Sequence, residues 1–302
     1  MASISNGGVY WKRKGYVEIE MSDGSWRRFG NEENALDFRF HCAIPSGTMC
    51  PKFTVGILGL SKEHINALTV WQMAKAAKSL STNGKGRYRR IKVYAGYAKD
   101  NIANPLLDGC IIRAMPTQPP EMWLNFECLH ISSRYNVTDQ VKSSIKNKSL
   151  YYIAKSLAKL INLDSVLWQS ERVQKSRKAS FLLQSTPLIM IDEFAHRFNL
   201  SIGYSGGMMV VMDRHPEQGR IYNATVLSAD TGMIGVPRVN EVGADVKMRL
   251  NNSIRQFSWV YLKSELLPSA NGYYYVISRQ ISGQLRGHDW TSSLKLIREK
   301  KR

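Results

Sequence analysis

A match to the G-x-S-x-G pattern of serine hydrolases lies at residues 203–207, GYSGG. In those enzymes a strained turn between a strand and a helix exposes the serine hydroxyl beside an oxyanion hole. Here Ser205 could be the nucleophile, and an aspartate and His288 follow it in the order of a catalytic triad. Residues 208–212 (MMVVM), however, form an apolar run typical of a strand and not of a helix. We therefore interpret residues 203–207 as a hairpin turn.

The triplet Asp230-Thr231-Gly232 matches the signature of aspartic proteases, in which two like carboxylates share one proton. The chain has one copy, so a homodimer would have to supply the second. We interpret the triplet as a turn that begins at the aspartate. No Walker or Rossmann phosphate-binding pattern is present either. The sequence therefore predicts a non-enzymatic protein with no catalytic residues and no cofactor.

Histidine and cysteine could form a metal site only by coming together from distant segments. The four cysteines are Cys42, Cys50, Cys110 and Cys128. None belongs to a C-x-x-C pair, although His41-Cys42 and Cys128-x-His130 could converge on one zinc ion. Tetrahedral zinc sites normally use closely spaced ligand pairs. We expect buried, reduced thiols and no metal site.

The charge is the extreme feature of the composition: 42 Lys and Arg against 24 Asp and Glu give a formal net charge of +18. Basic residues concentrate at 85–99, at 142–178 and at 298–302. Such a chain needs an acidic partner or a reason to tolerate its own charge repulsion, and nucleic acid is the obvious acidic partner. The sequence nevertheless lacks a recognisable helix-turn-helix, zinc finger, RNA-recognition motif or GXXG clamp.

Aromatic residues keep the nucleic-acid alternative open. Seven Trp and fourteen Tyr could provide stacking platforms for a single strand on an OB-like barrel. Trp123, Trp259, Tyr273 and Tyr275 lie in alternating strand-like segments, which favours packing and subunit contacts instead. A basic nucleic-acid-binding protein is therefore the alternative hypothesis.

Residues 1–133 read mainly as strands. Apolar and polar residues alternate at 17–21, at 38–42, at 91–95 and at 124–128, which is the period of a half-buried sheet. One helix is expected after Ser61, with Ile65, Leu68 and Trp71 on one face. Residues 81–90 (STNGKGRYRR) read as a basic loop.

Residues 134–215 are predicted to form a small α/β domain. Apolar residues at 147–163 fall on one helical stripe, and a second helix should begin after Thr186 with Pro187 in its first position. A hairpin at 200–212 follows. Residues 216–302 return to strands, with Val246 and Met248 inward and with Tyr273, Tyr275 and Ile277 forming another inward row.

No apolar run reaches the roughly 20 residues that a membrane-spanning helix needs. The first fifteen residues have no apolar segment after their charges, so we expect a chain that folds in a cytoplasm without export and does not insert into membranes.

Several segments in sequence order resemble one family, the baseplate hub proteins of contractile-tailed phages, which are related in architecture to the trimeric base of type VI secretion spikes. The first is VYAGY at 93–97, followed by LLDGCII at 106–112. The second is QSTPL at 184–188, and the third is DTGMIGVPR at 230–238. The motifs NGYY at 271–274 and GHDW at 287–290 complete the pattern.

This resemblance implies a mainly β chain with a small α/β middle unit. Residues 1–133 and 216–302 would be two tube-like β-barrel domains of one fold, and 134–215 the α/β domain. Three chains would close a ring that joins a six-fold tail tube to a three-fold spike, without chemistry. The implied partners are two further copies, tail tube proteins, a central spike or tip protein, other baseplate proteins and the tape measure protein. The implied location is the virion tail baseplate, after assembly in the host cytoplasm.

Overall fold

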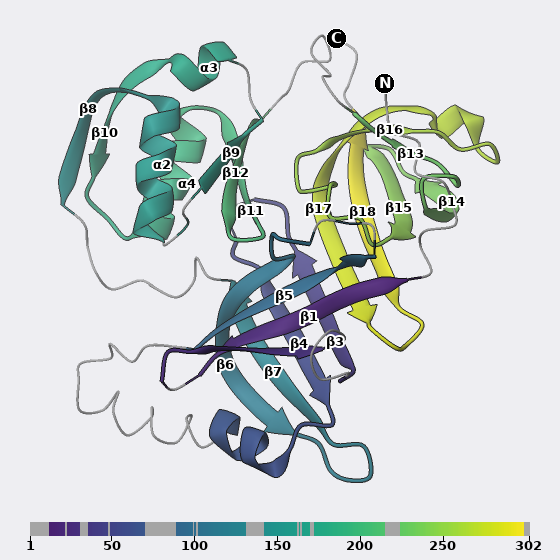
Figure 1. Ribbon diagram of the computed structural model, residues 1–302. Helices are drawn as coiled ribbons and strands as arrows, with labels where there is room; N and C mark the ends of the chain where they lie inside the picture. The colour runs from purple at the N-terminus through teal and green to yellow at the C-terminus, as the bar shows by residue number, and fades with distance from the viewer. Residues whose placement is uncertain are drawn as a thin grey trace.

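The computed structural model describes residues 12–21, 23–30, 36–47, 49–69, 89–98, 100, 102–130, 142–161, 163, 165–169, 172–214 and 224–298. Figure 1 shows three lobes: an N-terminal β-rich unit below, an α/β unit at upper left and a C-terminal β-rich unit at upper right. None of the helices within these ranges is both long and apolar enough to cross a bilayer.

The N-terminal unit contains seven strands and one helical segment. The strands are β1 (Arg13–Glu20), β2 (Trp26–Gly30), β3 (Phe38–Ile44), β4 (Lys52–Leu58), β5 (Arg90–Tyr97), β6 (Leu107–Pro116) and β7 (Trp123–His130). The alternation predicted from the sequence is confirmed in β3, where Phe38, Phe40 and Cys42 are buried and the residues between them are exposed. A helix covers residues 62–69, and the Ser61 hydroxyl accepts from the His64 N–H at 3.3 Å.

The middle unit combines two small sheets with three helices. Its elements are β8 (Ser143–Ser149), α2 (Leu150–Leu160), β9 (Ser165–Trp168), α3 (Arg172–Ser176), β10 (Lys178–Leu183), α4 (Pro187–Arg197), β11 (Leu200–Ser205) and β12 (Met208–Asp213). The helix after Thr186 and the hairpin of β11 and β12 are confirmed. The first helix begins later than predicted, because residues 143–149 pair with β10 as a strand and Ser149 caps α2 through the Tyr152 N–H.

The C-terminal unit has six strands: β13 (Thr225–Leu227), β14 (Met233–Val239), β15 (Gly243–Arg249), β16 (Trp259–Leu262), β17 (Gly272–Gln284) and β18 (Trp290–Arg298). A 3-10 helix, η4 (Pro268–Ala270), precedes β17. The predicted inward row of β17 is wrong by one residue. Tyr274 and Val276 are buried and Tyr273 is exposed, because the Tyr274 hydroxyl finds a buried acceptor in the Ala270 carbonyl at 2.7 Å.

The two β units share one sheet. Its strand order is β14-β15-β18-β17-β3-β4-β7-β6-β5-β1-β2, with β16 on β17 and β13 on β16. Because β3 pairs with the second half of β17, the described strands of both units belong to one sheet, and the two predicted closed barrels are not found among them. The mainly β class with an α/β middle unit is confirmed, whereas barrel closure stays a prediction.

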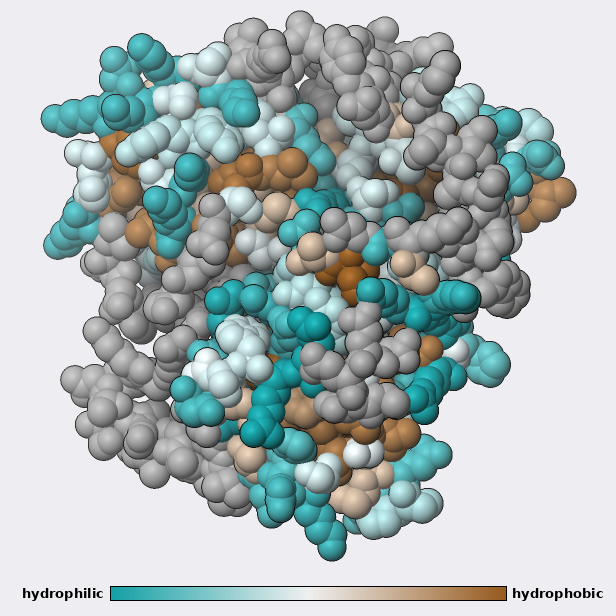
Figure 2. Space-filling model, viewed as in Figure 1, coloured by the Kyte–Doolittle hydropathy of each residue, from teal (hydrophilic) through white to brown (hydrophobic). Residues whose placement is uncertain are grey.

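The shared sheet also joins the apolar cores of the two β units. The largest core is built from the N-terminal unit but also contains Ile281 and Trp290 of the C-terminal unit. A second core fills the middle unit and a third fills the C-terminal unit. The face seen in Figure 2 shows hydrophobic side chains in separate patches between hydrophilic ones.

Some predictions lie outside the described residues. They are the domain boundaries after residues 133 and 215, most of the basic loop at 81–90, Trp71 and the basic end of the chain beyond residue 298. The division into domains 1–133, 134–215 and 216–302 therefore stays a prediction.

Candidate functional site

The G-x-S-x-G segment forms a tight hairpin turn. Gly206 and Gly207 have φ values of +54° and +80°, and strand β12 follows at once. Ser205 ends β11 with little exposure. A β-carbon on Gly206 would lie 2.7 Å from the carbonyl oxygen of Pro105, so this glycine is required by close approach as well as by its φ. The strand-to-helix context of a nucleophile elbow is absent from this segment.

The structure does not bring the other triad candidate to Ser205. The turn after β11 packs beside Pro105, just before β6 begins. His288 lies in the loop between β17 and β18 and lines a cavity together with Arg13 and Tyr97. Ser205 is not among the described residues that line this cavity. The structure therefore gives Ser205 and His288 different surroundings.

The Asp-Thr-Gly triplet lies in a turn, as predicted, but Asp230 does not organise it. The Ser228 N–H donates to Thr231 Oγ1 at 2.8 Å, and that hydroxyl donates to the Val226 carbonyl at 2.8 Å. Gly232 has a φ of +101°, which the turn requires. Serine and threonine therefore build the turn, and the Asp230 side chain is exposed.

The cysteine and histidine pairs do not form a metal centre among the described residues, which hold no group of three or more potential ligands. His41 and Cys42 are neighbours in a strand and point to opposite faces. Burial raises the pKa of the Cys42 thiol to about 12 and also raises the pKa of Cys128. Both thiols are therefore protonated at neutral pH.

Three of the four aromatic residues considered as stacking platforms pack within the fold. Trp123 is buried, and the Arg39 guanidinium lies 4.4 Å from its ring centre. Trp259 and Tyr275 contact each other edge to face at 5.6 Å. Tyr273 is the exposed member of the set.

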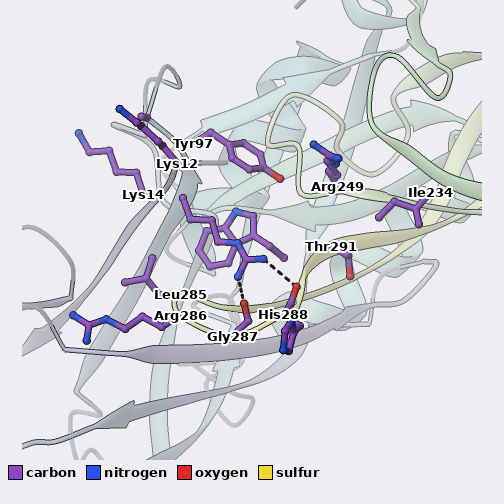
Figure 3. Close-up of a pocket in the computed structure, with 13 residues that line it drawn as sticks. Lys12, Lys14, Tyr97, Ile234, Arg249, Leu285, Arg286, Gly287, His288 and Thr291 are labelled. Atoms are coloured by element: carbon purple, nitrogen blue, oxygen red, sulfur yellow. Dashed lines mark hydrogen bonds between the residues drawn. The ribbon is translucent and has the colours of Figure 1, made fainter. Parts of the chain in front are cut away.

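A basic cavity of about 790 Å³ lies where the start of β1 meets the loop between β17 and β18. Figure 3 shows its lining from Lys12 and Lys14 on one side to Arg249 and Ile234 on the other. Its charged lining residues are Lys12, Arg13, Lys14, Arg249 and Arg286, with His288 beside them. None of the described residues that line it is acidic.

Arg13 anchors this loop from one side. Its guanidinium donates to the carbonyl oxygens of Gln284, Gly287 and His288, at 2.9 Å and 3.0 Å for the first and last. Asp37, just before β3, holds the loop from the other side. Sequence reasoning missed both residues, because no local pattern links Arg13 or Asp37 to a loop near residue 286.

Two edges of the sheet carry exposed apolar side chains. On β14, which pairs with β15 alone, these are Ile234, Val236 and Val239. On β6, residues 107–110 pair with β5, whereas the second half pairs only with β7 among the described strands and exposes Ile112 and Met115. Apolar strand edges of this kind are typical of interaction surfaces.

The face of the sheet that points away from the core is polar across seven strands. One cross-strand row follows the register through β15, β18, β17, β3, β4, β7 and β6. Its members in that order are Arg249, Thr291, Ser282, His41, Thr54, Glu127 and Arg113. Arg113 and Glu127 form an ion pair at 3.7 Å. This face is therefore suited to contact water.

The two β units repeat one strand path. In the N-terminal unit the path is β3-β4-β7-β6-β5, and in the C-terminal unit it is β14-β15-β18-β17-β16. All neighbours in both paths are antiparallel. Along the chain, each path consists of a hairpin (β3-β4 or β14-β15), then a single strand (β5 or β16), then a second hairpin (β6-β7 or β17-β18). The path makes β14 equivalent to β3, and β17 equivalent to β6.

Comparison with known protein families identifies the family of this chain. Residues 17–291 match the family model described as "Baseplate hub gp41". The chain belongs to this baseplate hub family. Membership places it among phage tail and baseplate proteins, which implies a location in the virion tail, and it gives no support to the nucleic-acid-binding alternative.

Solved structures of low sequence identity share the fold of this hub-family chain. A 43 kDa tail protein of prophage MuSo2 from Shewanella oneidensis is 10% identical with a TM-score of 0.54, over 95% of this chain and 99% of that one. A tail protein from Neisseria meningitidis MC58 is 10% identical with a TM-score of 0.52, over 94% and 97%.

The E. coli c3393 protein, a component of the type VI secretion system, is 9% identical with a TM-score of 0.51, over 88% of this chain and 75% of that one. A search of curated proteins finds no match.

Proposed function

We propose that the chain is a non-enzymatic structural subunit of a phage tail baseplate hub, three copies of which close a ring between a six-fold tail tube and a three-fold spike. The observation that carries this proposal is the repeated strand path of the two β units. A chain with two equivalent units can offer six similar surfaces from three copies, which matches a six-fold partner on one side and a three-fold partner on the other.

The contact within the chain suggests how the copies meet. Inside one chain the second half of β17 pairs with β3. The equivalent strands are β6 and β14, and each has a side that no described strand pairs with and that exposes apolar residues. In the proposed ring, Ile112 and Met115 of one copy face Ile234 and Val236 of the next. Gly235, with a φ of +72°, and Pro237 make β14 irregular, so side-chain packing would dominate this contact.

The polar face of the sheet supports the same arrangement. A ring whose sheets join edge to edge has one face toward its lumen and one toward its cores. The apolar side of this sheet contacts the cores, so the row from Arg249 to Arg113 would face the lumen.

Residues 1–133 and 216–302 would each act as one tube-like barrel segment, and 134–215 would lie on the outer or spike side of the ring. The partners would be two further copies, tube proteins, a spike or tip protein, other baseplate proteins and the tape measure protein. Assembly would take place in the host cytoplasm.

Native mass spectrometry over a range of protein concentrations tests the proposal. We expect a species of about 103 kDa, three times the 34.3 kDa chain. Replacement of Val236 by Glu should abolish that species and leave a folded monomer, because it would bury a charge in an apolar contact. Replacement of the exposed Leu266 by Glu is the matched control, because Leu266 lies between β16 and η4 and belongs to neither β14 nor β6. A wild-type chain that remains monomeric at high concentration, alone and with tube protein, would refute the ring.

A further inference from the structure

One carboxylate fixes the contact between the two β units within the chain. Asp37 immediately precedes β3, and its Oδ1 accepts from the Arg286 N–H at 3.0 Å. Its Oδ2 accepts from the Gln284 side-chain amide at 2.8 Å. The Leu285 N–H also donates to the Phe38 carbonyl at 2.9 Å. The residues before β3 therefore hold the loop that follows β17.

The proposed ring repeats this geometry between copies. Strand directions alternate along the sheet, so β14 of one copy would run antiparallel to β6 of the next. The start of β14 would then lie beside the end of β6. The segment before β14 would meet the hairpin that follows β6, residues 117–122, just as the segment before β3 meets the loop after β17. This step rests on the proposed function.

The segment before β14 and the hairpin after β6 each hold a polar group that could form a hydrogen bond to a second copy. Asp230 lies three residues before β14, in the turn that leads into it, and is exposed. No described residue hydrogen-bonds to its carboxylate; Ser228 and Thr231 make the hydrogen bonds of the turn. In the hairpin, the Thr117 and Trp123 N–H groups are taken by contacts within the hairpin. Gln118 is exposed and lies two positions after the last residue of β6. Arg286 likewise lies two positions after the last residue of β17.

We infer that Asp230 is an intersubunit latch whose carboxylate accepts the backbone N–H of Gln118 of a second copy. Pro119 and Pro120 follow Gln118 and have no N–H, so Gln118 is the donor at this point of the hairpin. A carboxylate that accepts a backbone N–H makes a charge-assisted hydrogen bond, which is stronger than a neutral one. The Asp-Thr-Gly triplet then has a role in assembly and not in catalysis.

Paired variants test the latch. Asp230→Ala removes the acceptor, and Gln118→Pro removes the proposed donor, whereas Gln118→Ala keeps the N–H. We expect Asp230→Ala and Gln118→Pro each to raise the concentration at which the trimer half-dissociates by at least tenfold. Gln118→Ala should change it by less than threefold, and the Asp230→Ala, Gln118→Pro double variant should lose no more than either single variant.

Analytical ultracentrifugation over a concentration series gives the readout, with thermal unfolding to show that each variant folds. Glu121→Gln is the charge control in the same hairpin and should not weaken the trimer. A wild-type trimer that Asp230→Ala and Gln118→Pro leave intact, or additive losses in the double variant, would overturn the latch and keep the ring. A wild-type chain that forms no trimer would overturn the ring itself, and the latch with it.

Discussion

Gly203 shows how a residue can match a catalytic motif for a structural reason. It belongs to β11 of the middle unit, and a β-carbon there would overlap the side chain of Gln256. Gln256 is buried in the C-terminal unit, and its Nε2 donates to the Pro45 carbonyl at 2.8 Å and to the Ile277 carbonyl at 3.1 Å. The first glycine of the G-x-S-x-G match thus makes room for a side chain that joins all three units.

His130 should make stability depend on pH. It is buried at the end of β7 with its ring 5.6 Å from that of Tyr204, and burial lowers its pKa to about 4. An unfolded histidine titrates near 6.5, so the unfolded chain binds the proton first as the pH falls. The free energy of unfolding is therefore unaffected by His130 above about pH 6.5, and it falls progressively as the pH is lowered toward 4.

The expected loss at pH 5 is about 2 kcal/mol relative to pH 8. Urea unfolding of the wild type and of His130→Phe at both pH values measures it, because phenylalanine keeps the aromatic contact but does not titrate. The variant should show a pH-dependent loss smaller by about that amount. Equal losses in the two proteins would show that His130 does not titrate with this shift.

At the scale of elements, local patterns predicted strands well and their partners poorly. The alternation in β3 and the start of α4 at Pro187 were visible in the sequence, because burial period and helix starts depend on neighbours within a few residues. The pairing of β3 with β17 joins residues more than 230 positions apart, and nothing local encodes it. The alternation in β17 predicted the wrong face, because aromatic and apolar residues occupy both faces there.

The contact of Gly203 with Gln256, where the three units meet, can be tested by one substitution. Gly203→Ala should force Gln256 from its site and break its two hydrogen bonds, which lowers the free energy of unfolding by roughly 2 kcal/mol. Thermal unfolding measures the change. Ser205→Ala, two residues away, is the matched control and should be nearly neutral, since its turn depends on Gly206 and Gly207. A Gly203→Ala protein as stable as the wild type would show that the junction is not needed.

At the scale of the whole molecule, the repeated strand path was not visible in the sequence, because the two units share connectivity without a sequence repeat. Part of the excess positive charge lies in the cavity between the two β units, which five Lys and Arg residues line. That cavity unites segments far apart in the chain, and none of its five basic residues belongs to the basic clusters predicted at 85–99, 142–178 and 298–302.

Electron cryomicroscopy of the assembled hub tests the central claim most directly. The account predicts a three-fold ring with six similar β units around one lumen, β14 of each copy against β6 of the next, and the polar row from Arg249 to Arg113 facing the lumen. A hub in which each copy contributes one β unit to the ring, or in which the polar row is packed against another chain away from the lumen, would contradict it.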